Sequence, residues 1–131
     1  MATILVIEDH PDNMELAVFL LQSAGHTVLS AVDAEAGLAL ARHELPNLIL
    51  MDIQLPGMDG LQATALLKQG DTTRAIPVLA LTALAMKGDE ERIRAGSCDG
   101  YIAKPIGVRD FLATIAAHVT TPLKTEADVS P

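Results

Sequence analysis

Short aliphatic segments alternate with amphipathic segments along the chain, and this alternation predicts a sequence of strands and helices. The aliphatic segments are predicted strands, at Thr3–Ile7, Thr27–Ala31, Asn47–Met51, Pro77–Leu81 and Gly100–Ala103. The remaining segments have apolar residues at helical spacing and are predicted helices, at Asp12–Ser23, Glu35–His43, Leu61–Gln69, Lys87–Ala95 and Val108–His118. Gly25 and Gly96 stand at predicted helix ends, and Asp33 is a predicted helix N-cap.

The predicted strands are apolar almost throughout, which is typical of strands that are buried on both faces. Strands of this kind, alternating with helices, indicate a parallel sheet covered by helices on both sides. Because the crossover connections are right-handed, few topologies remain. We therefore expect an α/β fold with a doubly wound, five-stranded parallel sheet.

Length and composition limit the possible classes of protein. With 131 residues, half of them apolar, the chain is expected to form one domain over residues 1–119, followed by a polar, disordered tail at residues 120–131. The net charge of −8 has the wrong sign for a nucleic-acid-binding protein. The lone cysteine, Cys98, excludes an internal disulfide. No signal peptide and no apolar run of about 18 residues is present, so we expect a cytoplasmic protein with no membrane contact.

Polar residues come directly after most of the predicted strands. Glu8 and Asp9 follow the first, Asp52 the third, Thr82 the fourth and Lys104 the fifth. Asp52 is the most conspicuous, since the segment LILMDIQLPGMDG brings a carboxylate directly after four apolar residues. Ligands of an open parallel sheet bind beyond the carboxyl ends of its strands. We therefore expect these side chains to share one edge of the sheet.

Three carboxylates on one edge are electrostatically unfavourable without a compensating positive charge. Two carboxylates about 4 Å apart repel by roughly 4 kcal/mol at an effective dielectric constant near 20. A cluster of this kind either raises a carboxyl pKa or binds a cation. The available ligands are oxygen atoms, which favours a hard cation, Mg²⁺ or Mn²⁺. A carboxylate beside such a cation, with lysine and threonine donors nearby, suits the transfer of a phosphoryl group to the carboxylate itself.

Four motifs occur in order along the chain: ILVIEDH, LILMDIQLPGMDG, VLALTA and YIAKP. With these motifs, the chain resembles the receiver domains of two-component response regulators, of the free-standing, single-domain type, and the resemblance spans roughly residues 3–118. The resemblance implies a flavodoxin-like sheet with strand order 2-1-3-4-5. It also implies that Asp52 accepts a phosphoryl group from a histidine kinase or a histidine phosphotransfer protein, and that the phosphorylated state signals to a downstream protein by direct contact.

The resemblance also implies roles for the surrounding residues. Asp9 and Asp52 would bind Mg²⁺ or Mn²⁺ together with the backbone carbonyl of Gln54, and Glu8 would contribute through a water molecule. Among the other residues, Thr82 and Lys104 would hold the phosphoryl oxygens. Phosphorylation-linked homodimerisation through the last helices is a further expectation from the family.

Several residues also have simpler interpretations. Tyr101 stands where the family keeps an aromatic switch, although a lone tyrosine near a strand edge also serves packing. Thr82 could cap the next helix, and Cys98 is expected to be a small buried side chain. The four histidines are interpreted as surface or structural residues, and His10 is set apart because it adjoins the acidic pair.

The residues two positions after Asp52 and Thr82 are Gln54 and Leu84, and neither carries a charge that would align or repel an attacking water. By family analogy this predicts a phosphoryl group that lasts for minutes or longer.

Other functions are less compatible with the sequence. A receiver segment of a hybrid histidine kinase is the main alternative. A magnesium-dependent phosphatase with an aspartyl nucleophile usually has a second acid where this chain has Gln54. A dinucleotide-binding protein would need glycines in the first loop, which reads EDHPDN. An adaptor that is not phosphorylated would normally have lost one of the acids or the lysine.

Overall fold

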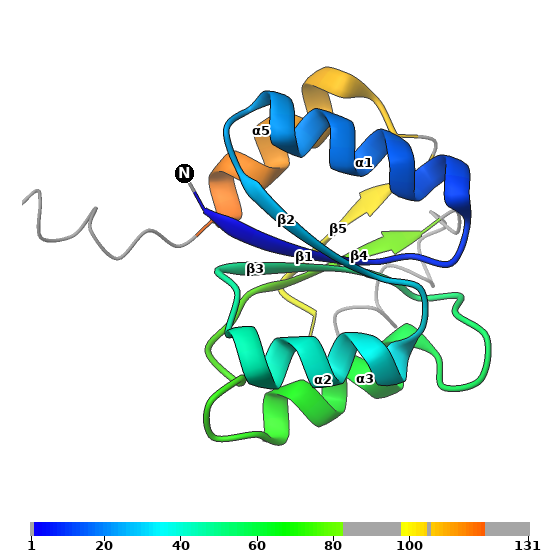
Figure 1. Ribbon diagram of the computed structural model, residues 1–131, viewed down its shortest axis with the longest axis vertical. Coiled ribbons are helices and arrows are strands. Elements are labelled where there is room, and N and C mark those ends of the chain that lie inside the picture. The colour runs from blue at the N-terminus through cyan, green and yellow to red at the C-terminus, as the bar shows by residue number, and fades with distance from the viewer. Residues whose placement is uncertain (1, 83–97, 105, 120–131) are drawn as a thin grey trace, which may run out of the picture.

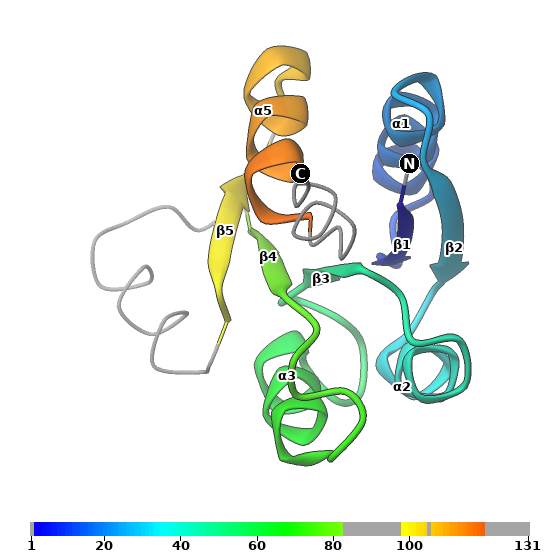
Figure 2. The same cartoon turned by 90° about the vertical axis from the view of Figure 1, so that its left-hand side faces the viewer.

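The computed structural model describes residues 2–82, 98–104 and 106–119. Its five strands form one parallel sheet in the order β2-β1-β3-β4-β5 (Figure 2). The predicted fold class and strand order are confirmed. The strands are β1 (Thr3–Ile7), β2 (Thr27–Ala31), β3 (Leu48–Asp52), β4 (Val78–Thr82) and β5 (Gly100–Ala103).

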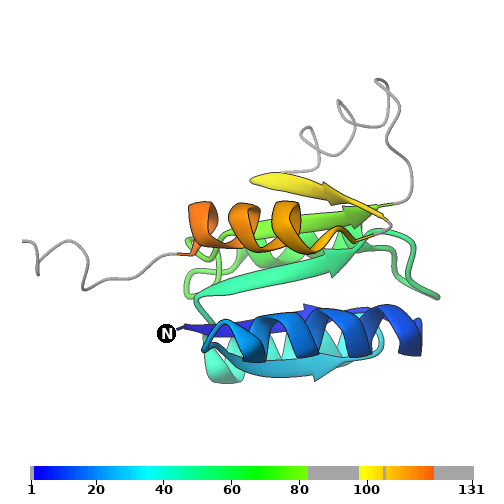
Figure 3. The same ribbon diagram turned by 90° about the horizontal axis from the view of Figure 1, so that it is seen from above.

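Four described helices cover both faces of the sheet: α1 (Pro11–Ser23), α2 (Ala34–Glu44), α3 (Gly60–Gln69) and α5 (Val108–His118). Helices α1 and α5 lie on one face, and α2 and α3 lie on the other (Figure 1; the first pair is seen from above in Figure 3). The predicted helix at Lys87–Ala95, together with Gly96, Leu84 and the predicted tail at residues 120–131, lies outside the described residues. Within the described part of the chain, no helix is long and apolar enough to cross a membrane.

Two strands begin and end one residue later than predicted. Asn47 does not open β3, because its side-chain oxygen accepts from the Thr3 N–H at 2.8 Å and its own N–H donates to the Thr3 carbonyl at 2.8 Å. At the other end, Asp52 pairs with Leu81 in the register of β3 and β4. In the same way β4 extends to Thr82, which pairs with Ala103. Both polar residues are therefore the last residues of strands, because a neighbouring strand still supplies backbone partners.

The core consists of two aliphatic clusters, one on each face of the sheet. Alternate residues of each strand point to opposite faces. Leu5, Ile7, Ile49 and Met51 pack toward α2 and α3, while Ile4, Val6, Leu48 and Leu50 pack toward α1 and α5. Phe111 of α5 is the aromatic residue that is fully buried among the described ones. The other large, fully buried side chains are aliphatic, and the predicted burial of Cys98 is confirmed, since it is 8% exposed.

Local capping fixes where α2 and α3 begin. Asp33 accepts a hydrogen bond from the Ala36 N–H at 2.8 Å, so the predicted N-cap is confirmed. An unpredicted capping box precedes α3: Asp59 accepts from the Gln62 N–H at 2.9 Å, and Gln62 accepts from the Asp59 N–H at 3.2 Å. The sequence signal was present, since an acidic residue three positions before a glutamine is the pattern of such a box. Gly25, with φ of +95°, adopts the left-handed conformation expected after α1.

Candidate functional site

The carboxyl ends of β1, β3 and β5 bring three charged side chains into direct contact. The Lys104 Nζ lies 3.1 Å from the Glu8 Oε1 and 3.3 Å from the Asp52 Oδ2. Glu8 is 1% exposed and Asp52 2% exposed, so two carboxylates are buried beside one ammonium group. The predicted convergence of these three residues at one edge of the sheet is therefore observed.

Strand alternation explains which side chains meet. Asp52 follows Leu48 and Leu50 in alternation, and these residues face α1 and α5. Glu8 and Lys104 continue the corresponding series of β1 and β5. These three side chains are therefore expected on one face, and the measured distances agree with that placement.

Thr82 belongs to the other alternation series. It follows Val78 and Ala80, which pack in the cluster facing α2 and α3, and Tyr101 packs against the same cluster. Thr82 is 1% exposed, and its carbonyl accepts from the Lys104 N–H at 2.8 Å. The structure thus brings Thr82 to the correct end of the sheet, on the face that it shares with Tyr101.

Backbone N–H groups orient both buried carboxylates. The Gln54 N–H donates to the Asp52 Oδ1 at 2.9 Å, and the His10 N–H donates to the Glu8 Oε2 at 3.1 Å. In each case the donor lies two residues after the acid, in the loop that leaves the strand. The loop after Asp52 is itself held by Gly60, whose N–H donates to the Ile53 carbonyl at 3.3 Å.

Close packing requires glycine at position 60. A Cβ atom there would lie 2.3 Å from the Asp52 carbonyl oxygen and 2.7 Å from the Ile53 Cα. Any larger residue would push the first turn of α3 away from the end of β3. The Asp59 capping box starts α3 at this same point. The capping box and the close packing at Gly60 therefore both help to position the residue after Asp52.

The two buried carboxyl groups have pKa values shifted in opposite directions. Burial raises the pKa of Glu8, and its interaction with Asp52 raises it further. Burial also acts to raise the pKa of Asp52, but the hydrogen bonds from Glu8 and the Gln54 N–H and the charge of Lys104 outweigh it and lower that pKa. Of the two carboxyl groups, Asp52 is therefore the one that loses its proton more readily.

The residues present fit a divalent cation. The Asp9 Oδ1 is buried without a hydrogen-bond partner, and the Glu8 Oε1 also lacks one, although it contacts the Lys104 ammonium group. Buried carboxylate oxygens without donors are the groups that a hard cation satisfies. Asp9, whose side chain is 28% exposed, also leaves a path from solvent to this edge.

His10 joins the acidic pair. Ligand atoms of Glu8, Asp9 and His10 all lie within 4.8 Å of one another, and this is the one such group of three among the described residues. The other histidines have local partners elsewhere: the His26 Nδ1 accepts from the Ala2 N–H at 3.2 Å, and His43 contacts Glu44 at 2.9 Å. The sequence shows that His10 is adjacent to Glu8 and Asp9, but it does not indicate that the imidazole ring lies close to their carboxyl groups.

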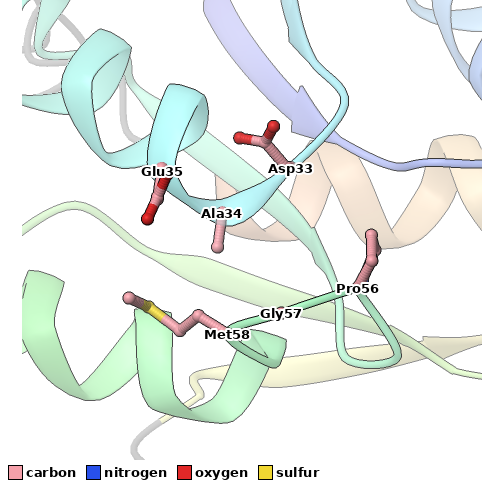
Figure 4. Close-up of a pocket in the computed structure, with 6 residues that line it drawn as sticks. All are labelled: Asp33, Ala34, Glu35, Pro56, Gly57 and Met58. Atoms are coloured by element: carbon pink, nitrogen blue, oxygen red, sulfur yellow. The ribbon is translucent and has the colours of Figure 1, made fainter.

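A cavity of about 300 Å³ lies near this edge but is not part of the site. Figure 4 shows it between the start of α2, at Asp33 and Glu35, and the loop of Pro56, Gly57 and Met58. None of the residues that line this cavity belongs to the cluster of Glu8, Asp52 and Lys104, and none of them carries a positive charge. The chemistry of the site is therefore concentrated in Glu8, Asp9, Asp52 and Lys104.

Comparison with known proteins agrees with this arrangement. The family model described as the response regulator receiver domain matches residues 4–116. The polar-differentiation response regulator DivK of Brucella anthropi is 47% identical over 117 residues, which cover 89% of this chain and 95% of that protein. DivK of Brucella ovis is 46% identical over the same shares of the two chains.

Solved structures have the same fold. The receiver domain of the sensor histidine kinase PA1611 from Pseudomonas aeruginosa PAO1, with a magnesium ion coordinated in its active-site cleft, has a TM-score of 0.83 and 31% identity, covering 89% of this chain and 96% of that one. A response regulator from Chloroflexus aurantiacus has a TM-score of 0.85 and 26% identity, covering 88% and 95%. The chemotaxis protein CheY4 of Vibrio cholerae, at 24% identity, has a TM-score of 0.86 and shows the shared fold, covering 91% and 99%. The chain belongs to the response regulator receiver domain family of two-component signalling systems.

Proposed function

We propose that Asp52 is the phosphoacceptor of this receiver domain. The observation that carries the proposal is the convergence of two buried carboxyl groups on the Lys104 ammonium group, which lies 3.1 Å from Glu8 and 3.3 Å from Asp52. The pKa of Asp52 is lowered there and that of Glu8 is raised. Asp52 also ends the central strand, at the edge where ligands of such sheets bind.

The donor is a phosphohistidine of a histidine kinase or of a histidine phosphotransfer protein. An Asp52 carboxylate oxygen attacks phosphorus, and an O–P bond forms as the N–P bond breaks. The imidazole nitrogen leaves with the electron pair of that bond. The Gln54 N–H, which donates to the Oδ1, holds the carboxylate in place and leaves the Oδ2 side for the reaction.

Receiver domains bind Mg²⁺ at an acidic site, and we assign the ligands here to Asp9, Asp52 and the Gln54 carbonyl, with Glu8 acting through water. Mn²⁺ has the same ligand preferences. When bound, the ion neutralises the charge that gathers on the phosphoryl oxygens. The buried Asp9 oxygen without a hydrogen-bond partner supports this assignment.

Lys104 and Thr82 are assigned to the phosphoryl oxygens. Lys104 contacts the Asp52 Oδ2 at 3.3 Å, so its ammonium group needs only a small movement to follow oxygen atoms added to that carboxylate. Thr82 ends the neighbouring strand, and its inward movement would open space on the face that it shares with Tyr101. This shared face supports Tyr101 as a switch residue, in addition to its packing.

The phosphorylated domain, expected to span residues 1–119, would act in the cytoplasm by contact with a downstream protein rather than as an enzyme on a separate substrate. Phosphorylation-linked homodimerisation would be one form of such contact. Gln54 is exposed and uncharged, which supports a phosphoryl group that lasts for minutes. Acid-quenched samples taken over one hour measure this lifetime, and complete loss within seconds would contradict it.

The central test compares wild-type protein, Asp52→Asn and the control Asp71→Asn, since Asp71 is exposed and lies outside the site. Each is incubated with Mg²⁺ and acetyl phosphate, quenched in acid and weighed by intact mass spectrometry. We expect wild type and Asp71→Asn to gain one phosphoryl group and Asp52→Asn to gain none. Equal labelling of Asp52→Asn and wild type would place the acceptor elsewhere.

A further inference from the structure

His10 occupies a helix N-cap position without serving as a cap. It precedes α1, has φ of −86° and ψ of 120°, and makes no side-chain capping hydrogen bond. Serine, threonine, aspartate and asparagine are preferred at this position because their side chains accept from the first turn of the helix. The imidazole of His10 therefore does not cap α1.

The backbone directs this ring toward the acidic pair. The His10 N–H donates to the Glu8 Oε2 at 3.1 Å, which ties the residue to the end of β1. The His10 Nδ1 then lies 3.8 Å from the Asp9 Oδ1, which is buried and has no hydrogen-bond partner. The distance is too long for a hydrogen bond, but two ligands of one metal ion are ordinarily about 3 to 4 Å apart, given metal–ligand bonds of roughly 2.1 Å.

The set of ligand atoms is consistent with one shared ion. Atoms of Glu8, Asp9 and His10 all lie within 4.8 Å of one another, close to the span of about 4.2 Å between opposite ligands of an octahedral ion. Glu8 is 1% exposed, and its Oε1 makes an ion pair with the Lys104 ammonium group at 3.1 Å, so the Asp9 Oδ1 is the buried oxygen of the set that has neither a hydrogen bond nor a lysine contact. The His10 side chain is 61% exposed, so an ion can reach the site from solvent.

Ligand chemistry distinguishes this set from a purely acidic one. Carboxylates and carbonyls suit Mg²⁺ and Mn²⁺, whereas an imidazole nitrogen favours Ni²⁺, Co²⁺ and Zn²⁺. We propose that His10 is a nitrogen ligand that gives the acidic site of this receiver a selective affinity for first-row transition-metal dications over Mg²⁺. This inference rests on the metal site of the proposed function and extends it to the choice of metal.

Calorimetric titration of the full chain with Ni²⁺ and with Mg²⁺ tests the proposal. The variant is His10→Asn, because asparagine is a good N-cap and preserves the start of α1. The matched control is His43→Asn, because His43 also lies beside an acid, with its Nδ1 2.9 Å from the Glu44 Oε2. His43 is far along the chain from the proposed metal site. We expect His10→Asn to weaken Ni²⁺ binding by at least about tenfold, the lower end of what even outer-shell groups contribute, and to change Mg²⁺ binding by less than about twofold.

Nuclear magnetic resonance of the histidine rings provides a second readout. Substoichiometric Ni²⁺, which is paramagnetic, should broaden the ring signals of His10 before those of His26, His43 and His118. Unchanged Ni²⁺ affinity in His10→Asn, or an equal loss in His43→Asn, would overturn the proposal. An equal loss of Ni²⁺ and Mg²⁺ affinity in His10→Asn would also overturn it, because His10 would then only position the acids. Absence of Mg²⁺ binding in wild type would instead contradict the proposed function.

Discussion

Two lysines pair with aspartates at opposite ends of the sheet, and their surroundings differ in one respect. At the amino ends of β4 and β5, the Lys68 Nζ donates to the Asp99 Oδ2 at 3.0 Å and to the Ile76 carbonyl at 2.9 Å. Asp99 also accepts from the Val78 N–H at 2.7 Å. At the carboxyl ends, Lys104 faces two carboxyl groups, those of Glu8 and Asp52.

The difference is one of charge balance. The pair at the amino ends has one positive and one negative charge, and its aspartate is 42% exposed. The cluster at the carboxyl ends holds one ammonium group among two buried carboxylates, with Asp9 close to Glu8. A balanced, hydrogen-bonded pair stabilises the fold, whereas an excess of buried carboxylates calls for a proton, a metal ion or both. Charge imbalance thus distinguishes the surroundings of Lys104 from those of Lys68.

Replacement of Lys104 by methionine should have the largest effect on function. Removal of one donor to a developing charge typically costs on the order of 100- to 1,000-fold in rate. We expect phosphorylation of Lys104→Met by acetyl phosphate to slow by about this factor, and any phosphorylation-driven change in backbone amide spectra to be lost. Mg²⁺ binding should persist. A normal rate and a normal spectral change would show that Lys104 takes no part in the mechanism. The two lysines would then not differ in function.

Replacement of Gly60 by alanine should have the largest effect on stability. The added Cβ would meet the Asp52 carbonyl oxygen and the Ile53 Cα, both backbone atoms that cannot rotate away. Overpacking of this kind costs about 1–3 kcal/mol. The comparison is Gly107→Ala, where a Cβ meets nothing within 4 Å and the loss should stay below about 1 kcal/mol. Urea unfolding of both variants measures the difference, and equal losses would show that the end of β3 tolerates displacement.

Replacement of Lys68 by methionine should destabilise the fold without affecting the chemistry. The variant loses the donor to Asp99 and to the Ile76 carbonyl, at a net cost of about 1–3 kcal/mol. Its phosphorylation rate should match wild type. Arg109→Met is a suitable control, because Arg109 is exposed and surface changes usually stay within about 0.5 kcal/mol. A phosphorylation defect in folded Lys68→Met would mean that the two ends of the sheet are coupled.

Replacement of Glu8 by glutamine should produce the smallest effect, and one that depends on pH. The folded pKa of Glu8 is raised, so its contribution to stability is fully present below the unfolded pKa and is lost as the pH rises through the folded value. Glutamine cannot ionise, so without Mg²⁺ the variant should be more stable than wild type at pH 7. This advantage should shrink as the pH falls toward 4.5, the ordinary value for glutamate. Thermal unfolding in chelator across this range measures it, and a constant or inverted difference would show that Glu8 is ionised throughout.

Several features followed from local patterns in the sequence. The alternation of apolar runs with helical spacing correctly predicted five strands, the four described helices and the confirmed Asp33 cap. The positions of Glu8, Asp52 and Lys104 after strands predicted their meeting, because parallel strands end at one edge. The predicted ends of β3 and β4 lie one residue early, because backbone pairing continues each strand through its polar residue, Asp52 or Thr82.

What the sequence by itself determined is therefore the fold class, the strand order through family motifs, and the list of charged residues at one edge, because these depend on periodicity and chain order. Only the tertiary structure decided how that list divides: Glu8, Asp52 and Lys104 on one face, Thr82 with Tyr101 on the other, and His10 turned toward Asp9. It also decided that Lys68 and Asp99 pair across 31 positions, and that Gly60 must lack a side chain. These relations depend on distances between segments far apart in the chain, which local patterns do not contain.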